Sequence, residues 1–297
     1  MQTNFIALLD EVKGFWRPSP DKPEETPERT LCALWSTASG RPVSADRASD
    51  ETLPALDAEA QKRLRELLEL RRSGVPLAHL TQRQFFLGLE LLAGGEALIP
   101  RKETEILGRA ALAKLQAMAA GRPSLTVIDV CTGSGNLALA YGFYRPEARV
   151  FGSDITAESV GLARRNADHL RLASRVAFHQ GDLLEPFDNA DFLGRVDLLS
   201  CNPPYISSAK VKALDPEIGR FEPHAAFDGG AFGVSILMKL LRQAPRFLRP
   251  GGWLGFEVGL GQGPGLLRQI ERNPAFAAVE AHRDAAGEVR AILARAA

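Results

Sequence analysis

Apolar residues in the first 75 positions recur three and four residues apart, which is the spacing of amphipathic helices. One set consists of Phe5, Leu8, Leu9 and Val12, and a later one of Leu64, Leu67 and Leu68. Between them, Thr26 and Pro27 are a typical N-cap and first-turn pair for another helix. Residues 1–75 are therefore predicted to form a small helical domain.

Beyond residue 100 the pattern changes to short apolar runs that alternate with segments of helical period. The runs predict strands near residues 125–130, 149–154, 175–180, 196–201, 253–258, 277–281 and 289–293. Helices are expected near residues 137–144, 157–170 and 234–247. This alternation favours an α/β fold with a mostly parallel sheet, to which the last two strands add an antiparallel edge. Residues 76–99, where glycines interrupt the helical period, are expected to be a hairpin-like linker before a domain at 100–297.

Composition and charge restrict the possible functions of the chain. It has 297 residues, of which 45% are hydrophobic and 24% charged, with a formal net charge of zero. A basic excess is absent and residues 1–80 are slightly acidic, so direct nucleic-acid binding is not expected. Three widely separated cysteines and five scattered histidines predict neither a disulfide framework nor a metal site. Without a signal peptide or a long apolar span, a cytoplasmic protein that does not enter membranes is expected.

The sequence Asn202-Pro203-Pro204-Tyr205 directly follows the strand predicted at residues 196–201. Because proline has no N–H, the pair ends the strand and leaves Asn202 at the carboxyl edge of the sheet, where open α/β folds bind ligands. The side-chain oxygen of Asn202 and the carbonyl of Pro203 can then accept hydrogen bonds from one planar –NH2 group. Asn-Pro also occurs in ordinary turns, so the interpretation depends on the neighbouring motifs.

A glycine-containing turn links the strand at residues 125–130 to a helix and predicts a nucleotide-binding site. Its predicted cofactor contacts are Asp129, Cys131, Thr132, Gly133, Ser134 and Gly135. The two glycines let the backbone turn sharply and approach a ligand. This fingerprint alone does not distinguish NAD from S-adenosylmethionine.

Two acidic residues follow the next two strands and are predicted to bind the adenosine part of the cofactor. Asp154, beside Ile155, can accept from both ribose hydroxyls, and a simple helix N-cap is the alternative. Asp182 can accept from an adenine amino group while Leu183 lines the ring, and an Asx-turn is the alternative.

With the stretch Leu98-Ile99-Pro100-Arg101-Lys102-Glu103-Thr104-Glu105, these motifs closely resemble the HemK/PrmC family of protein-(glutamine-N5) methyltransferases. That family shows a LIPRPETE-like stretch, a D-x-G-T-G-S-G turn and NPPY in this order. The likeness covers residues 76–295 and continues through Phe221-Glu222-Pro223, Asp228-Gly229-Gly230, Pro250-Gly251-Gly252 and Glu257-Val258-Gly259.

The resemblance implies a Rossmann-like class I methyltransferase domain at residues 100–297, with S-adenosylmethionine as its cofactor. It further implies that the substrate is a glutamine of a translation protein such as a peptide chain release factor. Residues 1–75 are predicted to recognise that protein, because a linker separates them from the rest of the chain and this part of the sequence is slightly acidic. A monomer is expected. The implied catalytic residues are Asn202, Pro203, Pro204 and Tyr205, and the implied substrate ligands are Arg101, Glu103, Asn202, Pro203 and Tyr205, with Asn202 also beside the cofactor.

Three departures from the family pattern leave alternatives open. Cys131 replaces the first glycine of the turn, and the related branch that methylates a ribosomal-protein glutamine often has cysteine there. Lys102 replaces a proline, and Phe232-Gly233-Val234 replaces the usual D-G-L, so a small-molecule N-methyltransferase also remains open. Outside the family, the motifs permit an adenine-N6 nucleic-acid methyltransferase, a dinucleotide oxidoreductase or a non-catalytic binding module.

Overall fold

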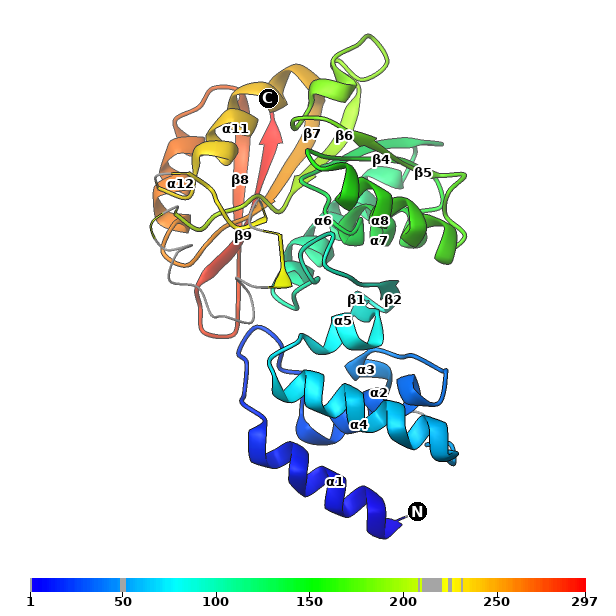
Figure 1. Cartoon of the computed structure of the whole chain (residues 1–297). Helices are drawn as coiled ribbons and strands as arrows, with labels where there is room; N and C mark the ends of the chain where they lie inside the picture. Colours follow the sequence, from blue (N-terminus) through cyan, green and yellow to red (C-terminus); the bar gives the residue numbers. More distant parts are fainter. Residues whose placement is uncertain (1, 49–51, 208, 210–220, 224–225, 231) are drawn as a thin grey trace. The chain divides into compact units, whose positions relative to one another are not determined.

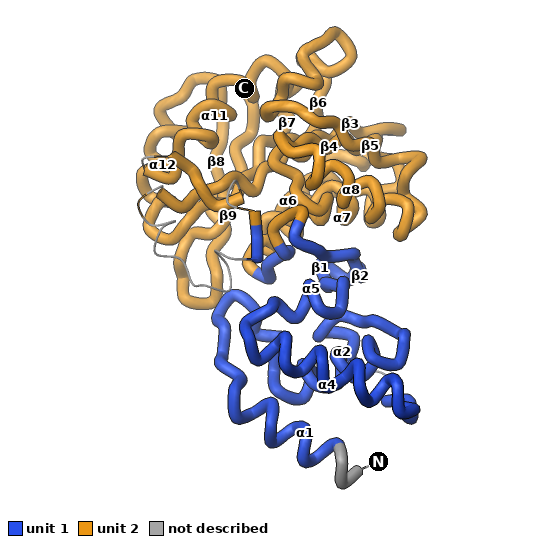
Figure 2. The backbone as a smooth tube through the Cα atoms, in the orientation of Figure 1, with its two compact units in different colours: residues 1–95, 99–102, 215–222 blue, residues 96–98, 103–214, 223–297 orange. Residues whose placement is uncertain are grey.

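The computed structural model consists of two compact units (Figure 2). One contains residues 1–95, 99–102 and 215–222, and the other contains residues 96–98, 103–214 and 223–297. The structure describes residues 2–48, 52–207, 209, 221–223, 226–230 and 232–297.

The first unit is built from helices and one hairpin (Figure 1). The helices are α1 (Gln2–Phe15), α2 (Pro27–Ala38), α3 (Ala45–Ala48), α4 (Ala58–Arg72) and α5 (Leu77–Thr81). The predicted N-cap of α2 is confirmed, because the Thr26 side chain accepts from the backbone N–H of Arg29 at 3.3 Å. The apolar stripes meet in one core, which includes Leu8, Val12, Leu31, Leu34, Trp35, Leu64 and Leu68.

The hairpin pairs β1 (Arg83–Phe86) with β2 (Leu89–Leu92) in antiparallel register. Its two-residue loop has positive φ at Leu87 (46°) and Gly88 (85°), as the tight turns of hairpins require. Residues up to 95 belong to the first unit, so most of the segment expected to be a linker is counted with the helices.

The second unit contains a seven-stranded sheet with the order β5-β4-β3-β6-β7-β9-β8. The strands are β3 (Leu125–Val130), β4 (Ala148–Asp154), β5 (Val176–Gln180), β6 (Val196–Cys201), β7 (Leu248–Glu257), β8 (Phe276–Arg283) and β9 (Val289–Ala296). Strands β3 to β7 are parallel, whereas β9 is antiparallel to both of its neighbours. The predicted parallel sheet with an antiparallel edge is confirmed. The insertion of β9 between β7 and β8 was not predicted.

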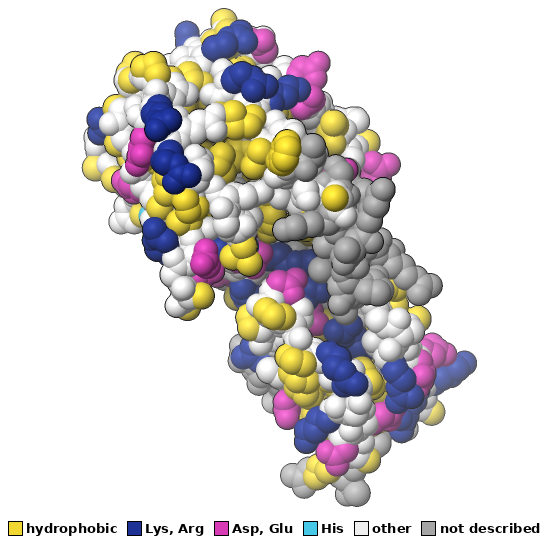
Figure 3. Space-filling view, turned by 90° about the vertical axis from the view of Figure 1, so that its left-hand side faces the viewer, with side chains coloured by type: hydrophobic (Ala, Val, Ile, Leu, Met, Phe, Trp, Pro, Cys, Tyr) yellow, Lys and Arg dark blue, Asp and Glu magenta, His cyan; other side chains and the backbone are white. Residues whose placement is uncertain are grey.

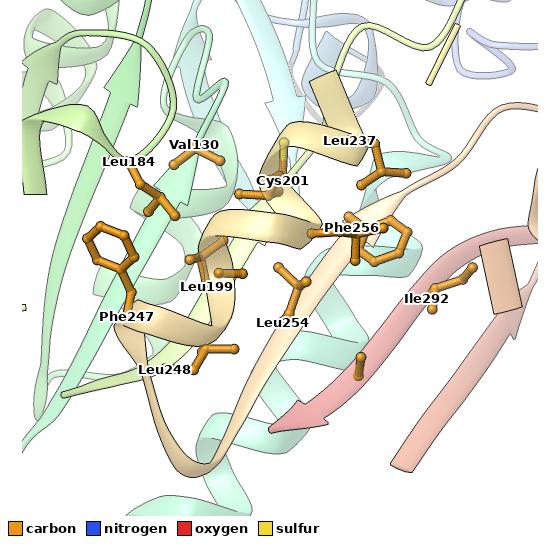
Figure 4. Packing of buried hydrophobic residues seen from close by; sticks show 14 of the residues in the cluster. Val130, Leu184, Leu199, Cys201, Leu237, Phe247, Leu248, Leu254, Phe256 and Ile292 are labelled. Atoms are coloured by element: carbon orange, nitrogen blue, oxygen red, sulfur yellow. The ribbon is translucent and has the colours of Figure 1, made fainter. Parts of the chain in front are cut away.

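Helices cover both faces of this sheet (Figure 1). On one face lie α6 (Thr104–Ala119), α7 (Asn136–Tyr144) and α8 (Ala157–His169); on the other lie α11 (Ser235–Phe247) and α12 (Gly263–Glu271). Every residue of β6 is buried, as expected for a central strand covered on both sides. Leu199 and Cys201 of β6 pack with Phe256 of β7 and Leu237 of α11 (Figure 4). This packing fixes the end of β6, where the Asn-Pro-Pro-Tyr motif begins.

Candidate active site

The carboxyl ends of β3 and β6 lie side by side in the sheet. Val130 and Cys201, the last residues of the two strands, are partners in the parallel register. The chain continues from β3 to β4 on one side of β3, whereas β6 lies on the other side. The order of the strands thus reverses at β3, and open α/β sheets bind ligands at such a point. The glycine turn and Asn202 both start from it.

The two glycines of the turn serve different purposes. Both have positive φ, 53° at Gly133 and 82° at Gly135. A Cβ on Gly135 would lie 2.8 Å from Cζ of Phe178, so internal packing excludes any larger residue there. A Cβ on Gly133 would meet only Cβ of Ala97, at 3.9 Å. The backbone at Gly133 is therefore open to a ligand.

Asp129 holds the turn from inside the sheet. Its carboxylate is buried and accepts from the hydroxyls of Thr132 and Ser200, each at 2.6 Å. Burial raises the pKa of Asp129 to about 7, although both hydrogen bonds favour its charged form. Ser134 is also buried, and its carbonyl accepts from Asn166 at 3.0 Å. Asp129, Thr132 and Ser134 thus shape the cofactor turn, and their predicted contact with the cofactor itself stays a prediction.

Asp154 bridges the turn and the start of α8. One carboxylate oxygen accepts from the N–H of Gly133 at 2.9 Å, and the other from the N–H and hydroxyl of Thr156, both at 3.2 Å. The alternative that Asp154 caps α8 is wrong, because Thr156 is the N-cap and accepts from Ser159. Asp154 is partly exposed and each of its oxygens has a further lone pair. Beside it, Ile155 leaves 61% of its surface exposed, an apolar face next to a polar acceptor.

Asp182 and Leu183 follow β5 as predicted, and each has internal contacts. The half-exposed Asp182 carboxylate pairs with Lys239 of α11. Leu183 has a positive φ of 54°, its side chain is buried, and its carbonyl accepts from the Ser153 hydroxyl at 2.6 Å. These contacts hold the loop against β4, at the same sheet edge as Asp154.

The side chains of the NPPY motif point back toward the start of α6. Asn202 donates from Nδ2 to the Thr104 hydroxyl at 3.1 Å. The Tyr205 hydroxyl donates to Glu103 at 3.3 Å, and Arg290 contacts the same carboxylate at 2.8 Å. Burial and the neighbouring carboxylates hold the pKa of Tyr205 well above its usual value, so the phenol keeps its proton.

The backbone of the motif is enclosed by two glycines and one glutamine. A Cβ on Gly229 would lie 2.4 Å from the carbonyl oxygen of Pro204, and one on Gly233 would lie 2.1 Å from that of Tyr205. Gln262 donates to the same Tyr205 carbonyl at 3.0 Å. This packing accounts for the glycine of Phe232-Gly233-Val234, while the Phe232 side chain itself is exposed. Neither Gly233 nor Gln262 was predicted to have a role in the site.

In the sequence, Glu257, the last residue of β7, stands out only as part of the Glu257-Val258-Gly259 motif that resembles the family pattern. Its carboxylate is buried, and burial raises its pKa to about 7. The Thr104 hydroxyl, Arg290 and Tyr205 oppose that rise. The Nη2 atom of Arg290 lies 4.0 Å from Oε1 of Glu257. An acidic residue at the end of a predicted buried strand could have indicated a site residue. Its partners Thr104 and Arg290, however, lie far away in the sequence, so its role could not be predicted.

Arg101, a predicted substrate ligand, is buried in the first unit. It pairs with Glu222 at 2.6 Å and with Asp21 at 3.0 Å. Glu222 also accepts from the N–H of Ile99 at 2.8 Å. The neighbouring Lys102 pairs with Asp46 at 3.0 Å. These contacts give Arg101 an internal role, and its contact with substrate stays a prediction.

Metal-binding clusters and membrane-spanning helices are both absent from the described part of the chain. No three His, Cys, Asp or Glu side chains there come together as a metal site. None of the helices in these residues is long and apolar enough to cross a membrane.

The sheet order, the glycine turn at the reversal point and the acid that ends the next strand, Asp154, define a class I methyltransferase. A family model described as a methyltransferase domain matches residues 122–258. A release factor glutamine methyltransferase of Moorella thermoacetica is 36% identical over 260 residues, 88% of this chain and 87% of that protein. One of Rhodospirillum rubrum is 35% identical over 291 residues, 97% and 84% of the two chains. The chain belongs to the family of release factor glutamine methyltransferases.

Solved structures support the fold at lower identity. The catalytic domain of hMettl16 aligns with a TM-score of 0.53 and 16% identity over 82% of this chain and 83% of that one. Human methyltransferase 10 domain containing protein aligns with a TM-score of 0.51 and 14% identity, over 81% and 98%. Both likenesses concern the fold alone.

Proposed function

We propose that this enzyme methylates the side-chain nitrogen of a glutamine in a peptide chain release factor, with S-adenosylmethionine as methyl donor. The observation that carries the proposal is the Asn202 amide at the reversal point of the sheet, beside the glycine turn. The names of the relatives supply the substrate class. The reaction belongs in the cytoplasm, where proteins are synthesised.

The residues at the turn fit S-adenosylmethionine. Gly133 leaves its backbone approachable, and Asp154 offers carboxylate lone pairs to ribose hydroxyls. Ile155 offers an exposed apolar surface for the adenine ring, and Asp182 offers an acceptor for its amino group. When bound, the cofactor supplies a reactive methyl group on a sulfonium sulfur.

The NPPY motif would bind and orient the target amide. An amide nitrogen is a poor nucleophile because its lone pair is delocalised into the carbonyl. The Asn202 side-chain oxygen and the Pro203 carbonyl would accept hydrogen bonds from the two N–H groups of the glutamine amide. These bonds align the amide nitrogen and favour the positive charge that develops on it. Tyr205, held by Glu103, packs beside the glutamine. The proton can then leave to water.

We further propose that the first unit recognises the polypeptide that carries the glutamine. Its own hydrophobic core and its slightly acidic composition suit a protein partner better than a nucleic acid. On the face seen in Figure 3, basic and acidic side chains are interspersed. This arrangement favours a protein substrate over the adenine-N6 alternative.

Methyl transfer from labelled S-adenosylmethionine to a purified bacterial release factor tests the function. We expect label on the release factor, and peptide mass spectrometry should place one methyl group on a glutamine side chain. Ribosomal proteins and a single-stranded adenine-containing oligonucleotide serve as competing acceptors in the same assay. Label on either of them, with an unlabelled release factor, would contradict the proposed substrate.

Asp154→Ala is expected to weaken S-adenosylmethionine binding by about 1–3 kcal/mol, because ribose hydroxyls and the Gly133 N–H lose their acceptor. Calorimetric titration of the folded variant measures the change. Thr156→Ala is the matched control, because it removes a neighbour of Asp154 and the helix cap but keeps the carboxylate. Equal affinity in Asp154→Ala and the wild type, or tight binding of NAD by the wild type, would refute the assignment.

A further inference from the structure

The nitrogen end of the Asn202 side chain has a hydrogen-bond partner within the second unit. Its Nδ2 donates to Oγ1 of Thr104 at 3.1 Å, across 98 positions of sequence. Thr104 is 1% exposed and is the first residue of α6, which packs on β6, β7 and β9. Both partners therefore stand on packed elements.

The orientation of the Asn202 amide decides what it can bind. One end is an acceptor and the other carries two donors. A target amide nitrogen needs an acceptor, so only the orientation with Nδ2 toward Thr104 suits the proposed reaction. In the reversed orientation, the –NH2 group of Asn202 would face the –NH2 group of the substrate.

A hydroxyl alone does not fix that choice, because it both donates and accepts. Thr104 has a second neighbour, the buried carboxylate of Glu257. Neither oxygen of Glu257 has a hydrogen-bond partner among the described residues. A buried acceptor without a partner is unfavourable, so the neighbouring Thr104 hydroxyl is favoured to direct its proton toward Glu257. A hydroxyl that directs its proton to a carboxylate has only lone pairs left for Asn202.

We propose that Thr104 is a positioning residue, whose hydroxyl fixes the Asn202 oxygen as the end of the amide that meets the substrate. The proposal rests on the proposed function and adds a residue that selects an amide over a carboxylate. Glu257 acts behind it as the acceptor toward which the hydroxyl proton points, and Arg290 lies 4.0 Å from Oε1 of the same carboxylate.

Thr104→Val removes the hydroxyl and keeps the shape of the side chain. We expect kcat for the release factor to fall about 10-fold, the scale of one lost hydrogen bond, while the Kd for S-adenosylmethionine changes less than ~2-fold. Thr104→Ser keeps the hydroxyl and is expected to restore most of the activity. Thr30→Val, at a buried threonine of α2, is the control for loss of a hydroxyl elsewhere.

A competition assay supplies the readout that a merely structural role would not change. The competitor is the release factor with glutamate in place of the methylated glutamine. In the wild type the fixed oxygen of Asn202 repels a carboxylate. In Thr104→Val the Asn202 amide can turn its –NH2 group toward the substrate. The ratio of the inhibition constant of the glutamate protein to the KM of the glutamine protein should then fall about 5-fold or more.

Unchanged turnover in Thr104→Val, or lost turnover with unchanged discrimination against glutamate, would overturn the proposal. Failure of Thr104→Ser to restore activity would also overturn it. Asn202→Ala in the same assay distinguishes failure of the Thr104 proposal from failure of the proposed function. If Asn202→Ala is inactive and Thr104→Val is normal, only the role of Thr104 fails. If Asn202→Ala is fully active, the proposed function of the site fails.

Discussion

Asn202→Ala is expected to lower methyl transfer to the release factor by ~10²-fold or more, the scale of removing one preorganised polar group from an active site. The variant loses the side-chain oxygen that would accept from the target amide and leaves only the Pro203 carbonyl. Cofactor affinity should fall much less, because Asp154 ends β4 and Asp182 follows β5, whereas Asn202 follows β6. Single-turnover methyl transfer and calorimetry of the same preparation measure the two effects.

Two variants complete that experiment. Asn202→Asp keeps acceptors but adds charge and removes the donor to Thr104, so partial activity is expected. Asn189→Ala changes an exposed asparagine of a loop before β6 and should behave as wild type. Thermal melts check folding. A well-folded Asn202→Ala with normal turnover would show that the motif is only a turn.

Gly233→Ala is expected to destabilise the second unit by about 2–4 kcal/mol, from a strained backbone and overpacking together. The added Cβ would lie 2.1 Å from the Tyr205 carbonyl oxygen, in a residue whose φ is 71°. Because the collision is with backbone, the NPPY segment must move. Turnover per folded molecule should therefore fall at least ~10-fold as the acceptor geometry is lost.

Gly287→Ala is the control that separates the effect of backbone strain at positive φ from the effect of the steric clash with Tyr205. Gly287 has a φ of 83°, but a Cβ there would meet nothing within 4 Å. We expect a loss of about 1 kcal/mol in the free energy of unfolding and normal turnover. Chemical denaturation and single-turnover assays compare the two variants. Equal losses in both would show that the contact between Gly233 and Tyr205 is unimportant for the site.

Several features of this protein follow from the sequence because they depend on neighbours along the chain. The run at Val196–Cys201 predicts β6 without error, since burial on both faces leaves a continuous apolar pattern and two prolines end it. Thr26 caps α2 as predicted, because capping involves residues three positions apart. The order of the motifs also sufficed to predict the methyltransferase family.

Other features depended on which elements pack together, and there the sequence was insufficient. The sequence left open whether Asp154 caps a helix. In the structure the N–H of Gly133 donates to Asp154, and Thr156 is the N-cap of α8. Arg101 is paired with Glu222, which lies 121 positions away, and the sequence did not predict this internal role; its contact with substrate stays a prediction.

The sequence by itself determined the approximate positions of the seven strands of the large sheet and of α7, α8 and α11, and the places where the turn, the acids and the NPPY motif leave the sheet. These depend on local periodicity, proline and glycine. Only the tertiary structure decided that β9 lies between β7 and β8, that Gly233 and Gln262 enclose Tyr205, and that Thr104 holds Asn202. The physical reason is that a hydrogen bond or a close contact requires two groups to meet, and packing of distant elements determines which groups meet.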